Sequence, residues 1–304
     1  MSRHILDVLK ERGVSVHENV PTAPLCTIKI GGSAALFMEP TCKNELIDTV
    51  LLLKNRGYPY ALIGKGSNVV FGDGNLPIAL IRTTSLNAAR LCRNVLVADC
   101  GASLFSLSCL AARGGFADLD FCCGIPGTLG GALVMNAGAY GKSISDLVRS
   151  VRVLLPQTGE IRTLLRDELD FSYRKSAFQS SDMIALDAEL SLFSCEESSE
   201  IFSRMRALAA KRRQTQPLDL PNAGSVFRRP SPDLPISRML DEIGCKGMRI
   251  GGAAVSQKHA GFIVNLGGAT AADARELILC LQNKLEKERG IRPQIEWRFI
   301  PEKI

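Results

Sequence analysis

Apolar positions along the chain recur with helical spacing in some stretches and as short continuous runs in others. Between Lys43 and Arg56 they recur every three to four residues and stop at Gly57, which predicts a helix. Tyr60–Ile63 is an apolar run typical of a buried strand, and it leads directly into a glycine-rich segment. The same reasoning predicts helices at Ser103–Arg113, Glu196–Arg213, Ile236–Ile243 and Ala271–Arg289, and strands at Val69–Phe71, Ile78–Ile81, Val95–Val97, Val151–Leu155, Ile161–Leu164, Ile184–Phe193, Phe262–Asn265 and Ile295–Ile300.

The order of these elements bears on the fold class and on domain organisation. Strands and helices do not alternate strictly, which favours an α+β fold over a doubly wound parallel sheet. A chain of 304 residues is long enough for two domains. Composition changes near Cys195, where a polar helix and the proline-rich link Gln216–Pro221 follow. We therefore predict one domain over residues 1–195 and a second over residues 196–304.

Composition and charge restrict the partners. The net charge of +6 suits small anionic ligands as well as nucleic acid, but aromatics form only 6% of the chain, so a base-stacking surface is not expected. No apolar run is long enough to span a bilayer, and the charged terminus Met1–Arg12 predicts a short amphipathic helix and not a signal peptide. We expect no nucleic-acid and no membrane partner.

The ten cysteines form no Cys-x-x-Cys pair and no Cys/His spacing of a zinc site, so no metal is expected. The chain is too long and too apolar to need a disulfide framework. We interpret the cysteines as reduced thiols of a cytosolic protein, most of them buried as small hydrophobic side chains. Cys122 and Cys123 stand just before a glycine-rich segment, and packing is favoured for them over covalent attachment of a cofactor.

Two glycine-rich segments, Gly64–Asn68 and Gly124–Gly131, are the first candidates for ligand binding. Neither contains the Gly-x-x-x-x-Gly-Lys-Ser/Thr pattern, and Val69 stands where a dinucleotide-binding loop needs its third glycine. Glycines nevertheless let backbone N–H groups approach a pyrophosphate closely. Each segment alone is better explained as a structural tight turn, but together they predict two surfaces that clamp an extended dinucleotide.

Five motifs in chain order carry a resemblance that covers the chain from about Thr27 to Ile300. They are Gly64-Lys65-Gly66-Ser67-Asn68, Gly124-Ile125-Pro126-Gly127 with Met135-Asn136-Ala137-Gly138-Ala139-Tyr140-Gly141, Tyr173-Arg174-x-Ser176, Asn222-Ala223-Gly224-Ser225-Val226-Phe227, and Val255-Ser256-Gln257-Lys258-His259-Ala260-Gly261-Phe262-Ile263-Val264-Asn265. With them the chain resembles the UDP-N-acetylenolpyruvoylglucosamine reductase family.

The resemblance implies an FAD-binding domain of the p-cresol methylhydroxylase type, made of two subdomains, followed by an α+β substrate-binding domain. It implies an enzyme that reduces UDP-N-acetylglucosamine enolpyruvate to UDP-N-acetylmuramate for peptidoglycan synthesis, with NADPH as co-substrate. The expected protein is cytoplasmic and monomeric, binds FAD non-covalently and acts on a small-molecule substrate.

The resemblance also assigns residues. The catalytic three are Arg174, which stabilises the enolate formed when hydride adds to the enolpyruvyl group, Ser225, which protonates the α-carbon, and Glu296. Glu296 acts either as a protonated group near the same oxygens or by holding Arg174. The expected cofactor-binding residues are Gly64, Lys65, Gly66, Ser67, Asn68, Gly124, Ile125, Pro126, Gly127, Thr128, Gly130, Gly131, Asn136, Ala137, Gly138 and Ala139. The expected substrate-binding residues are Tyr173, Asn222, Arg229, Arg213, Lys258 and His259.

The chain departs from the family pattern at three places. Phe227-Arg228-Arg229-Pro230 replaces a Lys-Asn-Pro sequence of some members, so Arg229 is expected to replace an asparagine at the nucleotide diphosphate. Gln294–Arg298 keeps only the second glutamate of Glu-Pro-Glu-x-Arg. The interval between Arg174 and Ser225 has no room for the extra tyrosine-bearing loop of the longer family form, so another part of the chain must close over the substrate.

Some alternatives remain open from the residues alone. Lys211–Arg213 is either the solvated end of a helix or a diphosphate contact, and Lys258-His259 is either a turn or a ligand contact. Two other functions also use a flavin or nucleotide-sugar site: a flavin oxidase on the same FAD domain, and a non-catalytic nucleotide-sugar-binding regulator. The oxidase does not need Ser225 and Glu296, and the regulator has no need of the catalytic three.

Overall fold

The computed structural model describes residues 6, 8–10, 14–231 and 234–301. The chain forms two compact units, each built from three separate segments. Unit 1 comprises Met1–Glu18, Leu36–Lys65 and Ile78–Ala210, and unit 2 comprises Asn19–Ala35, Gly66–Pro77 and Lys211–Ile304. The predicted division into residues 1–195 and 196–304 stays a prediction. The predicted helix Met1–Arg12 lies largely outside the described residues.

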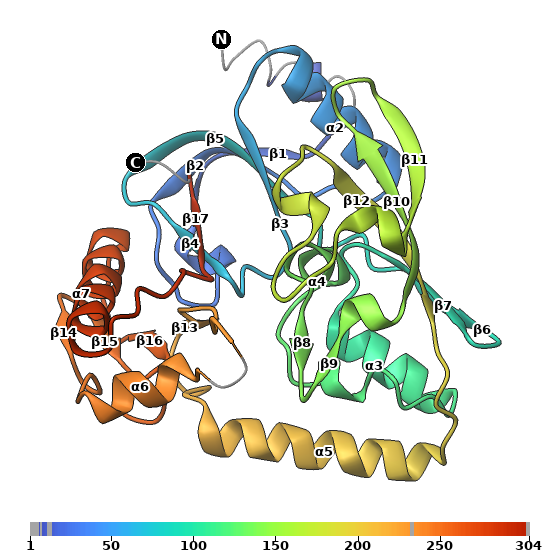
Figure 1. The fold of residues 1–304 in the computed structure, drawn as a ribbon. Helices are drawn as coiled ribbons and strands as arrows, with labels where there is room; N and C mark the ends of the chain where they lie inside the picture. The colour runs from blue at the N-terminus through green and yellow to red at the C-terminus, as the bar shows by residue number, and fades with distance from the viewer. Residues whose placement is uncertain (1–5, 7, 11–13, 232–233, 302–304) are drawn as a thin grey trace. The chain divides into compact units, whose positions relative to one another are not determined.

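A five-stranded antiparallel sheet is the largest element of unit 1, and its strand order is β11-β10-β12-β7-β6 (Figure 1). Its strands are β6 (Ala89–Cys92), β7 (Val95–Asp99), β10 (Val148–Leu155), β11 (Glu160–Leu165) and β12 (Ile184–Ser191). Side chains alternate between the two faces, so that Leu96 and Ala98 enter the core while Val97 and Asp99 line a hollow on the opposite face. The predicted hairpin of Val151–Leu155 with Ile161–Leu164 is confirmed.

Helices cover the core of unit 1. The helix α2 (Lys43–Asn55) buries Leu46, Val50 and Leu53 completely, at the helical spacing that predicted it. The other helices of this unit are α3 (Leu104–Arg113) and α4 (Leu129–Met135), and α5 (Ser198–Thr215) begins in unit 1 and ends in unit 2. The helix α4 contacts β7 and β12. It begins inside the second glycine-rich segment, where the sequence indicated only turns or a cradle.

Unit 2 contains an antiparallel sheet of order β13-β16-β15-β14, against which the long helix α7 (Ala271–Arg289) packs. The strands are β13 (Asn222–Ser225), β14 (Arg249–Ile250), β15 (Ala253–Val255) and β16 (Phe262–Asn265), and α6 (Ile236–Glu242) also contacts α7. Thr270 and Asp273 form a capping box at the start of α7, and Gly290 ends it in the left-handed conformation. A parallel pair of β4 (Val69–Phe71) with β17 (Arg298–Ile300) completes the unit.

The remaining strands are shared between the units or are very short. The sheet of order β1-β2-β5-β3 contains β1 (Val16–Pro21), β2 (Ser33–Met38), β5 (Asn75–Arg82) and β3 (Tyr60–Ile63), and the first three of these strands cross from one unit into the other along the chain. The short pair β8 (Gly138–Ala139) and β9 (Lys142–Ser143) belongs to unit 1. The predicted α+β class is confirmed, with antiparallel sheets predominating.

One motif has a form that its sequence does not indicate, and two expectations need correction. The Gly-Ser sequence of Asn222–Phe227 is typical of a turn, but its first four residues form β13, in which a register shift accompanies the left-handed Gly224 (φ +76°). The last strand begins at Arg298, and Ile295 makes only an isolated bridge. Most cysteines are not buried: four are buried, and no disulfide forms among the ten, all of which lie in the described part of the chain.

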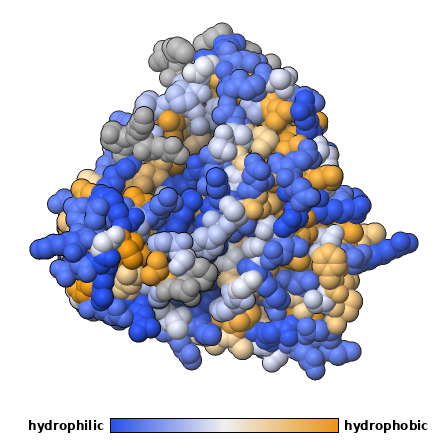
Figure 2. Space-filling view, viewed as in Figure 1, coloured by the Kyte–Doolittle hydropathy of each residue, from blue (hydrophilic) through white to orange (hydrophobic). Residues whose placement is uncertain are grey.

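The face of the molecule seen in Figure 2 is mainly hydrophilic, with hydrophobic positions scattered across it. Within residues 6–301, apart from the short gaps given above, no helix combines the length and the apolar character needed to cross a membrane.

Candidate functional site

The two glycine-rich segments touch each other within unit 1. A Cβ atom built on Gly64 would lie 2.3 Å from the Oγ1 atom of Thr128 and 2.9 Å from its Cγ2 atom. Thr128 is buried and caps α4, because its Oγ1 atom accepts a hydrogen bond from Gly131 N at 3.3 Å. Only glycine therefore fits at position 64, and the prediction that the two segments form neighbouring surfaces is consistent with this contact.

The loop that follows Gly64 presents unused backbone donors. Among the described residues, the amide N–H groups of Lys65, Gly66, Ser67 and Asn68 donate to no protein acceptor. Gly66 has a φ of +61°, and a Cβ atom there would lie 2.3 Å from the carbonyl oxygen of Leu25. Successive free N–H groups in a glycine-shaped loop are a site for an anion.

The side chain of Lys65 is anchored within unit 1. Its Nζ atom donates to the Oγ atom of Ser103 at 2.8 Å, and Ser103 is the residue immediately before α3. The second glycine-rich segment is fastened to the same connection between β7 and α3. Leu129 N donates to Ala102 O at 2.9 Å, and Gly130 N donates to Cys100 O at 2.7 Å. The predicted residues from Gly124 to Gly131 therefore form a supported loop that ends at the start of α4.

The Tyr-Arg motif forms a strained turn that is held from several sides. Arg174 has a φ of +56°, in the left-handed region that costs a non-glycine residue about 1–2 kcal/mol. Ser172 and Lys175 exchange two backbone hydrogen bonds of 3.1 Å across the turn. The Nε2 atom of Gln179 donates to the carbonyl oxygen of Arg174 at 3.0 Å. A strained backbone conformation of this kind persists only where the surrounding hydrogen bonds fix it, and strained residues are found most often at functional sites.

The guanidinium of Arg174 lies at the end of α4. Its Nη2 atom donates to Gly138 O at 3.1 Å and its Nη1 atom to Asn136 O at 3.5 Å, while its Cζ atom lies 5.3 Å from the centre of the Tyr173 ring. Asn136 ends α4 in the left-handed conformation, and its side chain donates to Ser172 O at 2.9 Å. The structure thus brings the predicted residues Asn136–Ala139, Tyr173 and Arg174 together in unit 1.

Ser225 and Glu296 lie on neighbouring backbone segments of unit 2. Glu296 N donates to Val226 O at 2.7 Å, and Arg228 N donates to Gln294 O at 2.9 Å. Ser225 is exposed and Glu296 is half-buried. Within the described part of the chain, the Ser225 hydroxyl makes no hydrogen bond, so its proton is available to a ligand.

The side chain of Asn68 fixes the same region. Its Nδ2 atom donates to the backbone carbonyl oxygen of Glu296 at 3.1 Å. The backbone carbonyl oxygen of Asn68 in turn accepts from Arg298 N at 3.0 Å. The first glycine-rich loop, in which Asn68 is a predicted cofactor residue, is therefore tied directly to the backbone of the predicted catalytic glutamate.

The predicted substrate residues of unit 2 occupy different local settings. Asn222 uses both amide atoms within its own segment, because Nδ2 donates to Leu220 O at 2.8 Å and Oδ1 accepts from Gly224 N at 3.0 Å. Lys258 Nζ donates to the carbonyl oxygen of Arg213, in the last turn of α5. Arg213 and Arg229 are exposed. Their assignment to the diphosphate stays a prediction.

His259 begins a turn before β16. Its backbone N–H and that of Lys258 both donate to the Ser256 hydroxyl, at 3.3 Å and 3.1 Å. Its Nδ1 atom accepts from Gly261 N at 3.2 Å, which leaves Nε2 as the protonated ring nitrogen of the neutral side chain. Burial lowers the pKa of His259 below its usual value, so the ring is neutral at pH 7.

The two adjacent cysteines are explained by packing. Cys122 is fully buried in the core of unit 1, and burial raises the pKa of its thiol far above the usual value. A protonated thiol is a poor nucleophile. Cys123 Sγ donates to the carbonyl oxygen of Met205 at 3.5 Å. The setting of Cys122 therefore does not favour covalent attachment.

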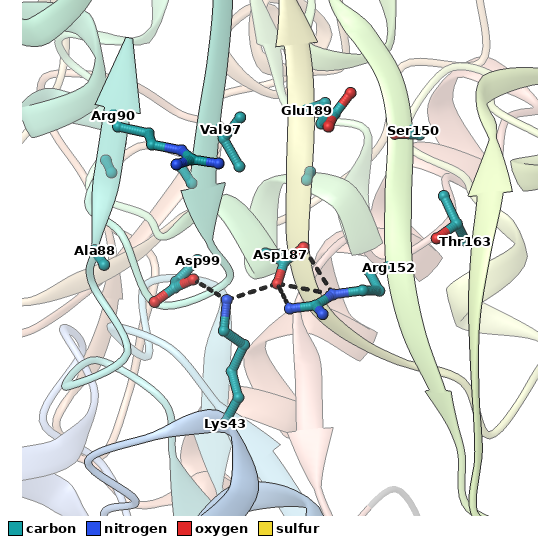
Figure 3. A pocket seen from close by; sticks show the side chains of 13 residues that line it. Lys43, Ala88, Arg90, Val97, Asp99, Ser150, Arg152, Thr163, Asp187 and Glu189 are labelled. Carbon is teal, nitrogen blue, oxygen red and sulfur yellow. Dashed lines mark hydrogen bonds and ion pairs between the residues drawn. The ribbon is translucent and has the colours of Figure 1, made fainter. Parts of the chain in front are cut away.

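A separate polar hollow of about 500 Å³ lies on the open face of the five-stranded sheet (Figure 3). Lys43 Nζ donates to Asp99 Oδ1 at 2.6 Å and to Asp187 Oδ2 at 2.7 Å, and Arg152 also pairs with Asp187. Burial alone would raise the pKa of Asp187, but the hydrogen bonds from Arg152 and Lys43 outweigh it, so the pKa is lowered. None of the predicted site residues lines this hollow, and its charges are largely satisfied by one another.

Sequence reasoning missed several residues that hold the site. Gln179 supports the Arg174 turn, Ser103 binds Lys65, and Trp297 Nε1 donates to Gly224 O at 3.2 Å. For two of them the one available signal was closeness in sequence to a predicted motif, because Gln179 follows the Tyr-Arg-x-Ser motif and Trp297 follows Glu296. Nothing in the sequence signals Ser103. In the part of the chain that the structure describes, no group of His, Cys, Asp or Glu side chains could hold a metal ion.

Two segments of the chain match the profiles of known protein families. Residues 34–165 match the profile of an FAD binding domain, and residues 216–300 match that of the UDP-N-acetylenolpyruvoylglucosamine reductase C-terminal domain. UDP-N-acetylenolpyruvoylglucosamine reductase 2 of Bacillus cereus (strain ATCC 10987 / NRS 248) is 39% identical over 277 residues, covering 90% of this chain and 89% of that protein. The reductase of Clostridium botulinum (strain 657 / Type Ba4) is 36% identical over 296 residues, covering 97% and 95%.

A solved structure gives the same result. The crystal structure of UDP-N-acetylenolpyruvylglucosamine reductase from Thermus caldophilus aligns with a TM-score of 0.78 and 30% identity, covering 94% of this chain and 98% of that one. The fold is therefore similar over nearly the full described length.

Proposed function

Because the chain belongs to the UDP-N-acetylenolpyruvoylglucosamine reductase family, we propose that it reduces UDP-N-acetylglucosamine enolpyruvate to UDP-N-acetylmuramate with electrons from NADPH. The observation that carries this proposal is the match to named reductases over 90–97% of the chain. The product belongs to peptidoglycan synthesis, and the family match favours the reductase over the oxidase and the non-catalytic regulator.

The chain is a flavoprotein, and its residues fit FAD. The free N–H groups of Lys65–Asn68 suit the pyrophosphate, and Gly64 itself lies against Thr128 of the second glycine-rich segment. We assign Gly64–Asn68, Gly124–Gly131 and Asn136–Ala139 to cofactor binding. The bound flavin supplies the redox chemistry, taking electrons from NADPH and passing hydride to the substrate.

Arg174 is assigned to charge stabilisation. Addition of hydride to the β-carbon of the enolpyruvyl group leaves negative charge on the carboxylate side, and a fixed guanidinium stabilises that charge. The support for this role is the way Arg174 is held: its left-handed backbone is fixed by Gln179 and by the Ser172–Lys175 bonds, so little reorganisation is needed when the charge develops.

Ser225 is assigned to proton donation, and Glu296 is assigned with Arg174 to stabilising the enolate. The Ser225 hydroxyl is exposed and donates its proton to the α-carbon, which completes the reduction. A serine alkoxide is unfavourable, so a partner must resupply the proton. Glu296 is either a protonated group near the enolate oxygens or the carboxylate that holds Arg174. The diphosphate is assigned to Arg229 and Arg213, with Tyr173, Asn222, Lys258 and His259 as further substrate contacts.

The two half-reactions test the assignment of Ser225. NADPH reduces the flavin without any proton from Ser225, whereas reoxidation by the sugar nucleotide needs it. Ser225→Ala should therefore leave flavin bleaching by NADPH within about twofold of wild type, and slow reoxidation by about 10²–10⁴-fold, the usual contribution of general acid catalysis. Rapid mixing of pre-reduced variant with substrate measures the second rate. Reoxidation within about tenfold of wild type would remove Ser225 from the catalytic residues.

Three further properties complete the proposal. We propose a cytoplasmic enzyme, which its free cysteines suit, and the family resemblance carries the proposals that it is a monomer and that its partners are small molecules.

A further inference from the structure

The sole tryptophan of the chain lies between the two predicted catalytic residues of unit 2. Trp297 follows Glu296 directly in sequence and is 4% exposed. Its indole Nε1 atom donates to the carbonyl oxygen of Gly224 at 3.2 Å, and Gly224 directly precedes Ser225. One buried side chain thus connects the backbone of the glutamate segment to the residue before the serine.

The segment that carries Ser225 needs such a support. Gly224 is left-handed with φ +76°, and the register between β13 and β16 shifts between Asn222 and Ser225. After the shift, pairing resumes at Ser225, which lies opposite Phe262, and the N–H of the next residue, Val226, donates to Gly261 O at 2.9 Å. The indole bond holds the carbonyl of the peptide immediately before Ser225, at the register shift, in addition to the bond from Gly224 N to Asn222 Oδ1.

The other side of Trp297 is equally fixed. Glu296 N donates to Val226 O at 2.7 Å, Asn68 Nδ2 donates to Glu296 O at 3.1 Å, and Arg298 N donates to Asn68 O. The backbone residues on both sides of Trp297 are thus fixed by hydrogen bonds that do not involve the indole. The fixed backbone sets the direction in which the indole N–H points, and Gly224 O accepts the hydrogen bond from that direction.

We propose that Trp297 is a positioning residue that orients the Ser225 hydroxyl for protonation of the α-carbon by holding Gly224 O through its indole N–H. The inference rests on the proposed function, since it needs Ser225 to be the proton donor. Trp297 itself does not touch the reacting atoms. Its effect is exerted through one hydrogen bond, which an aromatic replacement without a donor removes.

The test is Trp297→Phe, measured on the two half-reactions of the holoenzyme. We expect reoxidation by the sugar nucleotide to slow about tenfold, the equivalent of one net hydrogen bond of about 1.4 kcal/mol, while flavin reduction by NADPH stays within about twofold. The matched control is Gln282→Met, which removes a similar bond from Gln282 Nε2 to Pro293 O at 2.9 Å and keeps the indole bond to Gly224 O. It should leave both rates within about twofold.

A double variant separates positioning from mere stability. In the Ser225→Ala background, Trp297→Phe should cost nothing further in reoxidation, because its effect passes through the serine hydroxyl. Independent, multiplying effects, equal slowing of both half-reactions, or unchanged reoxidation in Trp297→Phe would each overturn the positioning role alone. A wild-type rate in Ser225→Ala would instead overturn the catalytic assignment and the positioning role with it.

A second measurement uses the wild-type protein and tests the proposal even if the Trp297→Phe variant loses its flavin. Because the chain has one tryptophan, fluorotryptophan labelling of the wild-type protein gives a single ¹⁹F resonance. Binding of the enolpyruvyl sugar nucleotide to the oxidised holoenzyme should shift this resonance, since the hydroxyl next to Gly224 becomes engaged. A resonance that does not move at saturating substrate overturns the proposal.

Discussion

The contact between Gly64 and Thr128 gives a quantitative test of how the two glycine-rich segments support each other. An alanine at position 64 would place its Cβ atom 2.3 Å from Thr128 Oγ1. The threonine cannot turn away cheaply, because it is β-branched, buried and engaged as the cap of α4. Overpacking of this kind costs about 1–3 kcal/mol, so Gly64→Ala should lower the free energy of unfolding by about 2–3 kcal/mol.

The reciprocal change makes the test specific. Thr128→Ala alone loses the cap, at a cost of about 1 kcal/mol. It also removes the two nearest of the three atoms that the new Cβ atom would meet and leaves only Thr128 Cβ, at 3.2 Å. Gly64→Ala/Thr128→Ala should therefore be destabilised by about 1–2 kcal/mol rather than by the sum of about 3–4 kcal/mol. Urea unfolding of the holoprotein, followed by circular dichroism and by flavin release, measures all four species. Additive effects of the two substitutions would refute the close packing of the segments.

Three further expectations follow from the site and the sheet. Arg229→Ala should raise the Michaelis constant for the sugar nucleotide at least tenfold without changing flavin content, because a charge-assisted phosphate contact contributes about 1.5–3 kcal/mol; an unchanged constant would place Arg229 outside the substrate site. Acid precipitation should release the flavin into the supernatant, since the buried Cys122 thiol is a poor nucleophile and Cys123 Sγ donates to Met205 O; flavin retained in the pellet would contradict this. Asp187→Asn should lower the free energy of unfolding at pH 7 by about 1–3 kcal/mol, which is less than for a fully buried ion pair because the partners of Asp187 are partly exposed. The control Asp182→Asn, at an exposed ion pair, should change the free energy of unfolding by about 0.5 kcal/mol or less. Because the folded-state pKa of Asp187 is lowered, the cost of Asp187→Asn should persist above the ordinary carboxyl pKa of about 3.9 and vanish as the pH falls through the lowered value.

Local signals in the sequence were sufficient for most helices and strands. Gly57 follows the end of α2, and the range of α7 was predicted residue for residue because its apolar positions keep the helical spacing up to Gly290. The hairpin of β10 and β11 was predicted from two apolar runs around a short polar turn. These elements depend on contacts between residues close in sequence, which is why the pattern alone predicts them.

Other elements depend on contacts that no local pattern encodes. The helix α4 begins with two glycines after Leu129, which disfavour a helix, and it is stabilised instead by the Thr128 cap and by packing on β7 and β12. Lys43, Asp99 and Asp187 look like separate solvated positions in the sequence, and only the pairing of β7 with β12 brings the two carboxylates to one lysine.

The catalytic residues show the same division. Family motifs identified Arg174, Ser225 and Glu296, and the structure adds what holds them, namely Gln179 at the arginine turn and Trp297 next to Gly224. These supporting residues bind carbonyl groups rather than ligands. A carbonyl is present at every position of the chain, so no residue type marks the place where such a bond will form.

The parallel pairing of β4 with β17 sets an order of events during protein synthesis. Asn68, at the entry to β4, binds the carbonyl of Glu296 across an interval of 228 residues. While the ribosome is still translating the sheet of unit 1, β4, the strand that follows the loop Gly66–Asn68, has no partner strand because β17 has not yet been made. The glycine-rich segment nearest the N-terminus therefore reaches its final form among the last parts of the protein, after translation has passed Ile300. A nascent chain interrupted before that point should be unable to retain its flavin, however well the earlier strands have folded.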